Sequence, residues 1–113
     1  MSAITLSGEG SVAGIAGLLR DEIVNSGLSC ELVGSVSRGS GEYRVETMVF
    51  EKYYMRAGNR ASLTVVVSGA GNRVTVDAIG SGGGQGPVFR FSWGAEDSFA
   101  ETVADILRPH GFR

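Results

Sequence analysis

The residues with the most unusual chemistry are a run of glycines followed by alternating aromatic residues. Residues 80–86 contain five glycines, and consecutive glycines expose backbone N–H groups that can surround an anion. A strand is predicted over residues 88–93, and its alternate aromatic side chains would share one face. A wide hairpin connection and ordinary core aromatics are the alternatives. The candidate ligand-binding residues are Gly82, Gly83, Gly84, Gln85, Gly86, Phe91 and Trp93.

A second glycine motif lies near the N-terminus. Residues 8–13 match the G-x-G-x-x-A pattern of dinucleotide-binding turns, and Glu31 lies near the distance expected for a ribose ligand. That fold needs parallel strands joined by helices, whereas the later connections in this chain are short turns. Glu9 would also place a negative charge beside the pyrophosphate. The motif therefore favours a helix start, and no cofactor is expected.

Residues for catalysis or metal binding are few and scattered. His110 is the only histidine and follows Pro109 near a C-terminus that is expected to be loose, and Cys30 is the only cysteine. Metal sites need several grouped ligands, and none are grouped here. Glu46 and Glu51 have an odd spacing, which places them on opposite faces of a strand. The sequence therefore predicts no catalytic residue and no metal, and it favours a protein that is not an enzyme.

Length and charge narrow the class of protein further. The 113 residues suit one domain over 1–113, and the net charge of −2 comes without a basic cluster, which argues against a nucleic-acid partner. A charged-then-apolar leader is absent, and no apolar run approaches the roughly 20 residues that span a bilayer. We therefore expect a cytoplasmic protein without a membrane partner.

Two helical patterns and a series of alternating patterns predict the fold. Apolar residues recur at helical spacing in residues 12–23 and 99–107, and alternation predicts strands near residues 4–6, 28–33, 42–56, 62–67, 74–78 and 88–93. Residues 38–41, 57–60 and 69–72 are predicted turns, and turns this short imply antiparallel neighbours. The prediction is an α+β domain with a twisted antiparallel sheet of about five or six strands. Its element order is β-α-β-β-β-β-(β)-α, with two helices covering one face.

The strand over residues 42–56 has an ambiguous phase. Tyr43 and Val45 share one face, while Met48 and Phe50 share the other. Either a bulge near Thr47 shifts the phase, or both faces are partly covered. A mixed aromatic and charged patch on the outer sheet face would favour a protein partner. The candidate interface residues are Phe50, Lys52, Tyr53, Tyr54 and Arg56, and the expected partner is a second copy of the chain.

Two segments resemble a family of small uncharacterised bacterial proteins. They are residues 48–56 with 59–62, and residues 77–80 through 93–96. The family has no assigned activity, so the resemblance implies a fold and no site. The element order is also similar to TATA-binding-protein-like and helix-grip domains, whose functions range from DNA binding to lipid carriage.

These observations favour a small non-enzymatic binding or interaction module that self-associates through the open face of its sheet. One alternative is a helix-grip carrier that holds a small apolar ligand between the sheet and the last helix. Another is an enzyme that uses the glycine loop to hold a phosphorylated substrate.

Overall fold

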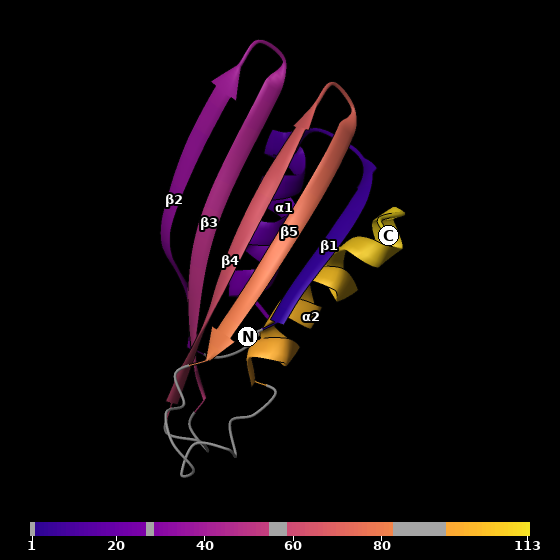
Figure 1. The fold of residues 1–113 in the computed structure, drawn as a ribbon. Coiled ribbons are helices and arrows are strands. Elements are labelled where there is room, and N and C mark those ends of the chain that lie inside the picture. The colour runs from indigo at the N-terminus through magenta and orange to yellow at the C-terminus, as the bar shows by residue number, and fades with distance from the viewer. Residues whose placement is uncertain (1, 27–28, 55–58, 83–94) are drawn as a thin grey trace.

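The computed structural model describes residues 2–26, 29–54, 59–82 and 95–113 (Figure 1). The strand predicted over residues 88–93 lies outside these ranges. The elements follow the order β1 (Ser2–Glu9), α1 (Val12–Val24), β2 (Cys30–Ser40), β3 (Tyr43–Tyr54), β4 (Asn59–Ala70), β5 (Arg73–Gly82), α2 (Ala95–Leu107) and a short 3-10 helix η2 (Arg108–His110).

The five strands form one antiparallel sheet with the order β1-β5-β4-β3-β2. Two hairpins have two-residue turns, at Gly41-Glu42 and Gly71-Asn72. Gly41 has φ 60° and Gly71 has φ 61°, the left-handed region that glycine enters without steric cost. The predicted fold class and antiparallel pairing are therefore confirmed.

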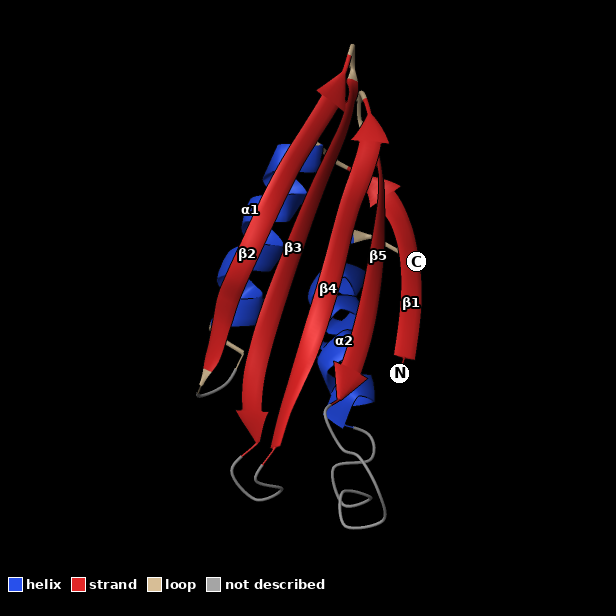
Figure 2. Cartoon of the chain, turned by 60° about the vertical axis from the view of Figure 1, so that its left-hand side comes forward, coloured by secondary structure: helices blue, strands red, loops and turns tan. Residues whose placement is uncertain are grey.

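Both helices cover the same face of the sheet, and the other face carries no described element (Figures 1 and 2). The core lies between these two layers. Alternate residues of the central strands point into it and are almost completely buried, as the period of two requires. They are Leu63, Val65, Val67, Val74, Val76 and Ala78. The helices add Leu19 and Ile23 from α1, and Phe99 and Val103 from α2.

The start and end of α1 follow from capping. The N–H of Gly14 donates to Ser11 Oγ over 3.0 Å, which satisfies one of the first four helical donors. Asn25 caps the other end, where its side-chain amide donates to the carbonyl of Asp21 over 2.8 Å. Gly10, Ser11 and the residues around them therefore begin a helix, as expected. The described strands form one antiparallel sheet, whereas a dinucleotide-binding fold needs parallel strands.

The irregularity in the strands lies in β2, not in β3. The register of β3 against β4 is continuous from Tyr43 to Tyr54, which rules out the first of the two alternatives, a bulge near Thr47. Instead the β2–β3 register shifts between Leu32 and Gly34. Val33 is the extra residue, and its side chain is 54% exposed. A bulge at an edge strand is common because only one neighbour constrains it.

The turn predicted over residues 38–41 begins too early. Arg38, Gly39 and Ser40 remain in β2 and pair with β3. Gly39 pairs with Arg44 inside the hairpin, so it is a strand residue and not a turn residue. The glycine signal alone does not distinguish these two positions.

The C-terminus is held in place rather than loose. Arg113 N donates to Ser7 O over 3.1 Å, and Ser7 N donates to Arg113 O over 2.9 Å. Phe112 is only 2% exposed, and Gly111, with φ 86°, turns the chain toward β1. The last residues therefore pair with the outer edge of β1.

Candidate interaction surface

The surface without a covering layer is the sheet face opposite the helices, which we call the open face. Figure 2 shows the sheet from this side, with both helices behind it. Side chains that alternate with the core residues form the face. Most are β-branched or small and polar. The middle of the open face consists of Thr5, Ser7, Val36, Val45, Thr47, Val49, Ser62, Thr64, Val66, Thr75, Asp77 and Ile79. The charged residues Glu9, Glu31, Arg38, Glu51, Arg60 and Arg73 lie on the same side, toward the edges of the sheet and the ends of its strands.

Two cross-strand rows form the centre of the open face. Ile79, Thr64 and Val49 lie opposite one another on β5, β4 and β3. In the next row, Asp77, Val66, Thr47 and Val36 lie opposite one another on β5, β4, β3 and β2. Neighbouring β-branched side chains already shield each other, so most are half-buried.

Several polar groups of the open face are already hydrogen-bonded within the sheet. Thr5 Oγ1 donates to Asp77 Oδ1 over 2.7 Å. The hydroxyls of Ser62 and Ser81 lie 2.7 Å apart, and the hydroxyls of Ser7 and Thr75 lie 3.1 Å apart. Covering such pairs costs less than covering unpaired polar groups. The face is therefore more easily desolvated than its Ser and Thr content indicates.

The predicted interface residues do not lie together on this face. Phe50 is completely buried under the helices, and Lys52, on the same side, lies with Nζ 5.8 Å from the centre of the Phe99 ring. Their placement in an outer patch is therefore wrong, because the phase of β3 turns them toward the core. Tyr53 is on the open-face side and is 40% exposed. Tyr54 pairs with position 59, and Arg56 lies outside the described residues.

The predicted ligand-binding residues are mostly beyond the described part of the chain. Gly82 is the last residue of β5, opposite Ala61, and it is exposed. The other candidates, Gly83, Gly84, Gln85, Gly86, Phe91 and Trp93, lie outside the described ranges. Their role as ligand residues stays a prediction.

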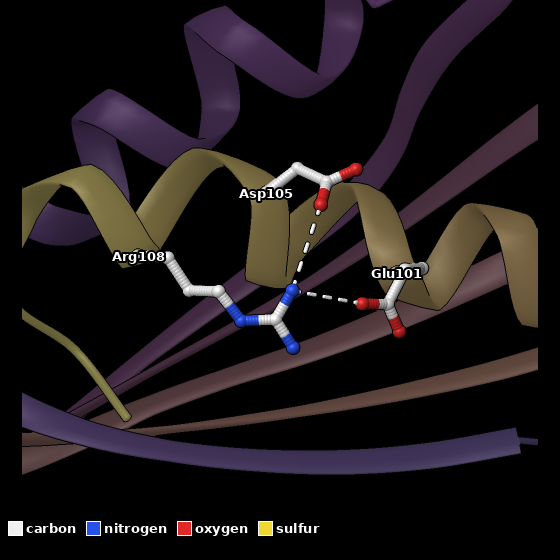
Figure 3. Close-up of polar contacts among 3 residues, drawn as sticks. All are labelled: Glu101, Asp105 and Arg108. Carbon is white, nitrogen blue, oxygen red and sulfur yellow. Dashed lines mark hydrogen bonds and ion pairs between the residues drawn. The ribbon is translucent and has the colours of Figure 1, made fainter.

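Two carboxylates of α2 pair with Arg108, the first residue of η2 (Figure 3). Arg108 Nη1 lies 3.0 Å from Glu101 Oε1 and 3.7 Å from Asp105 Oδ1. All three side chains are about half exposed or more, so solvent screens the pairs. Glu46 and Glu51 lie on opposite faces of β3, as expected. Among the residues described, His, Cys, Asp and Glu do not form a group of three that could hold a metal ion.

A hollow of about 350 Å³ lies at the end of the sheet where β2 begins. Its lining consists of Ser29, Cys30, Glu31, Glu51, Tyr53 and Arg60. Burial raises the pKa of the Cys30 thiol above its ordinary value, although Lys52 and a hydrogen bond with Ser26 act in the opposite direction. The thiol is therefore kept protonated near neutral pH and is poorly suited to act as a nucleophile.

Cys30 should react slowly with a thiol reagent in the folded protein. Because only the thiolate attacks and the side chain is 8% exposed, we expect a rate at pH 8 at least about tenfold below that of the unfolded chain. The folded rate should rise as pH increases through the raised pKa. Since this is the only cysteine, absorbance of the released thiolate of Ellman's reagent measures it directly, with guanidinium-unfolded protein as the control. Equal rates in the two states would contradict the burial.

The chain belongs to a family of unknown function, DUF6054, whose match covers residues 1–111. This confirms the resemblance to an uncharacterised family. Two solved structures match weakly over most of their length. One is TTHA0849 from Thermus thermophilus, with 11% identity, 95% of this chain and 92% of that chain covered, and a TM-score of 0.33.

The other is Ara h 8.0201, with 10% identity, 95% of this chain and 99% of that chain covered, and a TM-score of 0.28. Similarities this weak carry no argument about ligands or partners. The comparison with curated proteins gives no match. No helix in the described ranges is long and apolar enough to cross a membrane.

Sequence reasoning missed the residues that form the open face. It concentrated on aromatic and charged residues, whereas the centre of the face consists of Val49, Thr64, Val66 and Ile79. A usable signal exists in β4 and β5, where the outward positions 64, 66, 75 and 79 carry β-branched residues, whereas the uncovered face of an antiparallel sheet is usually polar.

Proposed function

We propose that this protein is a small, non-enzymatic interaction module that self-associates by stacking the open faces of two copies. The supporting observation is the asymmetry of the sheet: both helices cover one side, and the middle of the other side carries mainly Val, Ile, Thr and Ser, with Asp77 as its one charge and the other charges toward the edges and strand ends. The uncovered face of an antiparallel sheet is usually polar.

The size of the open face suits such an interface. Five strands spaced by about 4.8 Å, with roughly eight paired residues each, span a flat area of ~650 Å². A stable interface buries about 800 Å² per partner, and the relief of the side chains adds to the flat area. Stacked sheets pack about 10 Å apart with their side chains interdigitated, which Val and Thr allow.

Asp77 is the charge nearest the centre of the open face. Thr5 already donates a hydrogen bond to its carboxylate, so one acceptor position is satisfied before the face is covered. The remaining desolvation cost and the many hydroxyls argue for affinity in the micromolar range rather than tighter. Because burial of apolar surface drives it, the association should change little with sodium chloride.

Thr64→Arg tests the proposal, since position 64 lies on β4 in the middle of the open face. A long charged side chain there would hold two stacked sheets apart, while its stem can lie on the surface of an isolated copy. We expect a concentration-dependent dimer for the natural chain in sedimentation velocity. At a high sodium chloride concentration, where exposed ion pairs are screened, the variant should remain monomeric while the natural chain still dimerises, and its circular dichroism spectrum should be unchanged.

The matched control is Ala13→Arg, which adds the same charge on the exposed side of α1. It should dimerise as the natural chain does. If Thr64→Arg has the same association constant as this control, the open face is not the interface. The carrier and phosphate-binding alternatives stay predictions, because no observation on the described residues favours either of them.

A further inference from the structure

The edge strand β2 presents a long row of backbone groups to solvent. Residues 33–40 are all exposed, and no described element lies beyond them in the sheet. Edge strands present unpaired N–H and C=O groups that can pair with another strand. The opposite edge differs, because Ser7 of β1 pairs with Arg113.

Two opposite charges on β2 lack partners among the described residues. Glu31 lies directly opposite Glu51, and that neighbour is already paired with Arg60 Nη1 over 3.2 Å. Like charges placed opposite each other destabilise a sheet, so Glu31 gains nothing from its own neighbour. Arg38 reaches only the carbonyl of Ser37, at 3.2 Å from Nη1. Within the described ranges, neither charge is in an ion pair.

These charges are symmetrically placed about one residue of β2. On β3, Glu31 pairs with Glu51 and Arg38 pairs with Val45. Both of these β3 residues are three positions from Met48, which pairs with Ser35. Val33 bulges out of the register and does not change this count. Both side chains point toward the open-face side. Glu31 and Arg38 are therefore equidistant from Ser35 along the edge.

We propose that β2 pairs antiparallel with β2 of a second copy, around a two-fold axis at Ser35. This register places Glu31 opposite the partner's Arg38 and Arg38 opposite the partner's Glu31. Residues 34–37 lie between these two charges on the regular part of β2 and carry no charge. They therefore introduce no charge repulsion into this register. The pairing joins two sheets into one of ten strands. It does not depend on the open face and is a second self-interface.

Charge reversal and charge exchange test the pairing. Glu31→Arg would place two arginines opposite each other at both ends of the paired segment, and Arg38→Glu would place two glutamates there. Each single variant makes two repulsive pairs in the dimer, so we expect the association constant to fall at least about tenfold. The double variant E31R/R38E restores both attractive pairs and should return to within about threefold of the starting value.

All variants are made with Thr64→Arg, so that stacking of the open faces does not contribute. Sedimentation velocity at low ionic strength gives the association constants, and circular dichroism confirms the fold. Dimerisation of the Thr64→Arg protein should weaken as sodium chloride rises, because exposed ion pairs are screened.

Three results would overturn the pairing. One is a Thr64→Arg protein that stays monomeric at low ionic strength and high concentration. Another is single reversals that associate as strongly as their parent. The last is an exchanged double variant as weak as the singles. Failure of the open-face proposal would instead appear as indifference to Thr64→Arg itself, so the two outcomes are distinguishable.

Discussion

Truncating Phe112 to alanine should lower the free energy of unfolding by about 3–5 kcal/mol, the usual cost of removing a buried phenylalanine side chain. Phe112 is almost completely buried although it is the penultimate residue. Its ring holds the C-terminal segment, whose backbone forms two hydrogen bonds with Ser7. Urea unfolding followed by circular dichroism measures the change as a lower transition midpoint. A change below about 1 kcal/mol would show that the C-terminal segment adds little to the core.

Gly8 provides a matched test of the same contact. A Cβ on Gly8 would lie 2.6–2.8 Å from three ring atoms of Phe112, so Gly8→Ala should cost about 1–3 kcal/mol by overpacking. In the Phe112→Ala background the ring is gone, and most of that cost should disappear. Equal costs in both backgrounds would mean that the strand, not the ring, requires glycine.

Gly17→Ala is the control for a general effect of replacing glycine. Gly17 lies within α1, and a Cβ there meets nothing within 4 Å. We expect this change to stabilise the protein by about 0.5–1 kcal/mol, because alanine favours the helix. The different signs at Gly8 and Gly17 would separate close packing from helix propensity.

Phe50→Ala should also be strongly destabilising, by about 3–5 kcal/mol, whereas Tyr53→Ala should change stability by less than about 1 kcal/mol. The two residues are three positions apart on β3 and lie on opposite sides of it. Phe50 is 0% exposed and packs in the core, while Tyr53 is 40% exposed. Urea unfolding under identical conditions compares them, and equal losses would mean that the phase of β3 is not as described.

The same pair also separates stability from association. Phe50 contributes to the core of each copy and cannot contact a second copy while the protein is folded. Tyr53 lies on the open-face side near the end of β3 and can contribute to stacking without contributing to folding. An effect of Tyr53→Ala on dimerisation at unchanged stability would support the proposed interface.

The proposed open-face and edge interfaces use different parts of one sheet. Stacking covers its centre through apolar contact, and edge pairing extends it through backbone hydrogen bonds and two ion pairs. The first should be nearly indifferent to sodium chloride and the second sensitive to it. Their salt dependence therefore identifies which one dominates in solution.

The amino-acid sequence by itself determined the class of fold. Short glycine-containing turns such as Gly71-Asn72, and apolar alternation such as Leu63 to Val67, are local signals, and local chain geometry is sufficient to produce antiparallel hairpins. The capped start of α1 at Ser11 is equally local. The sheet, its helices and the existence of an open face were predictable for this reason.

Only the tertiary structure decided which side chains occupy each face and each edge. The phase of β3 depends on its pairing with β4 and on the helices above Phe50, and the bulge at Val33 depends on β3. The symmetric placement of Glu31 and Arg38 appears only after that bulge is counted, and the contact of Phe112 with Gly8 joins opposite ends of the chain. These features arise from packing between residues distant in sequence, and local residue patterns do not encode them.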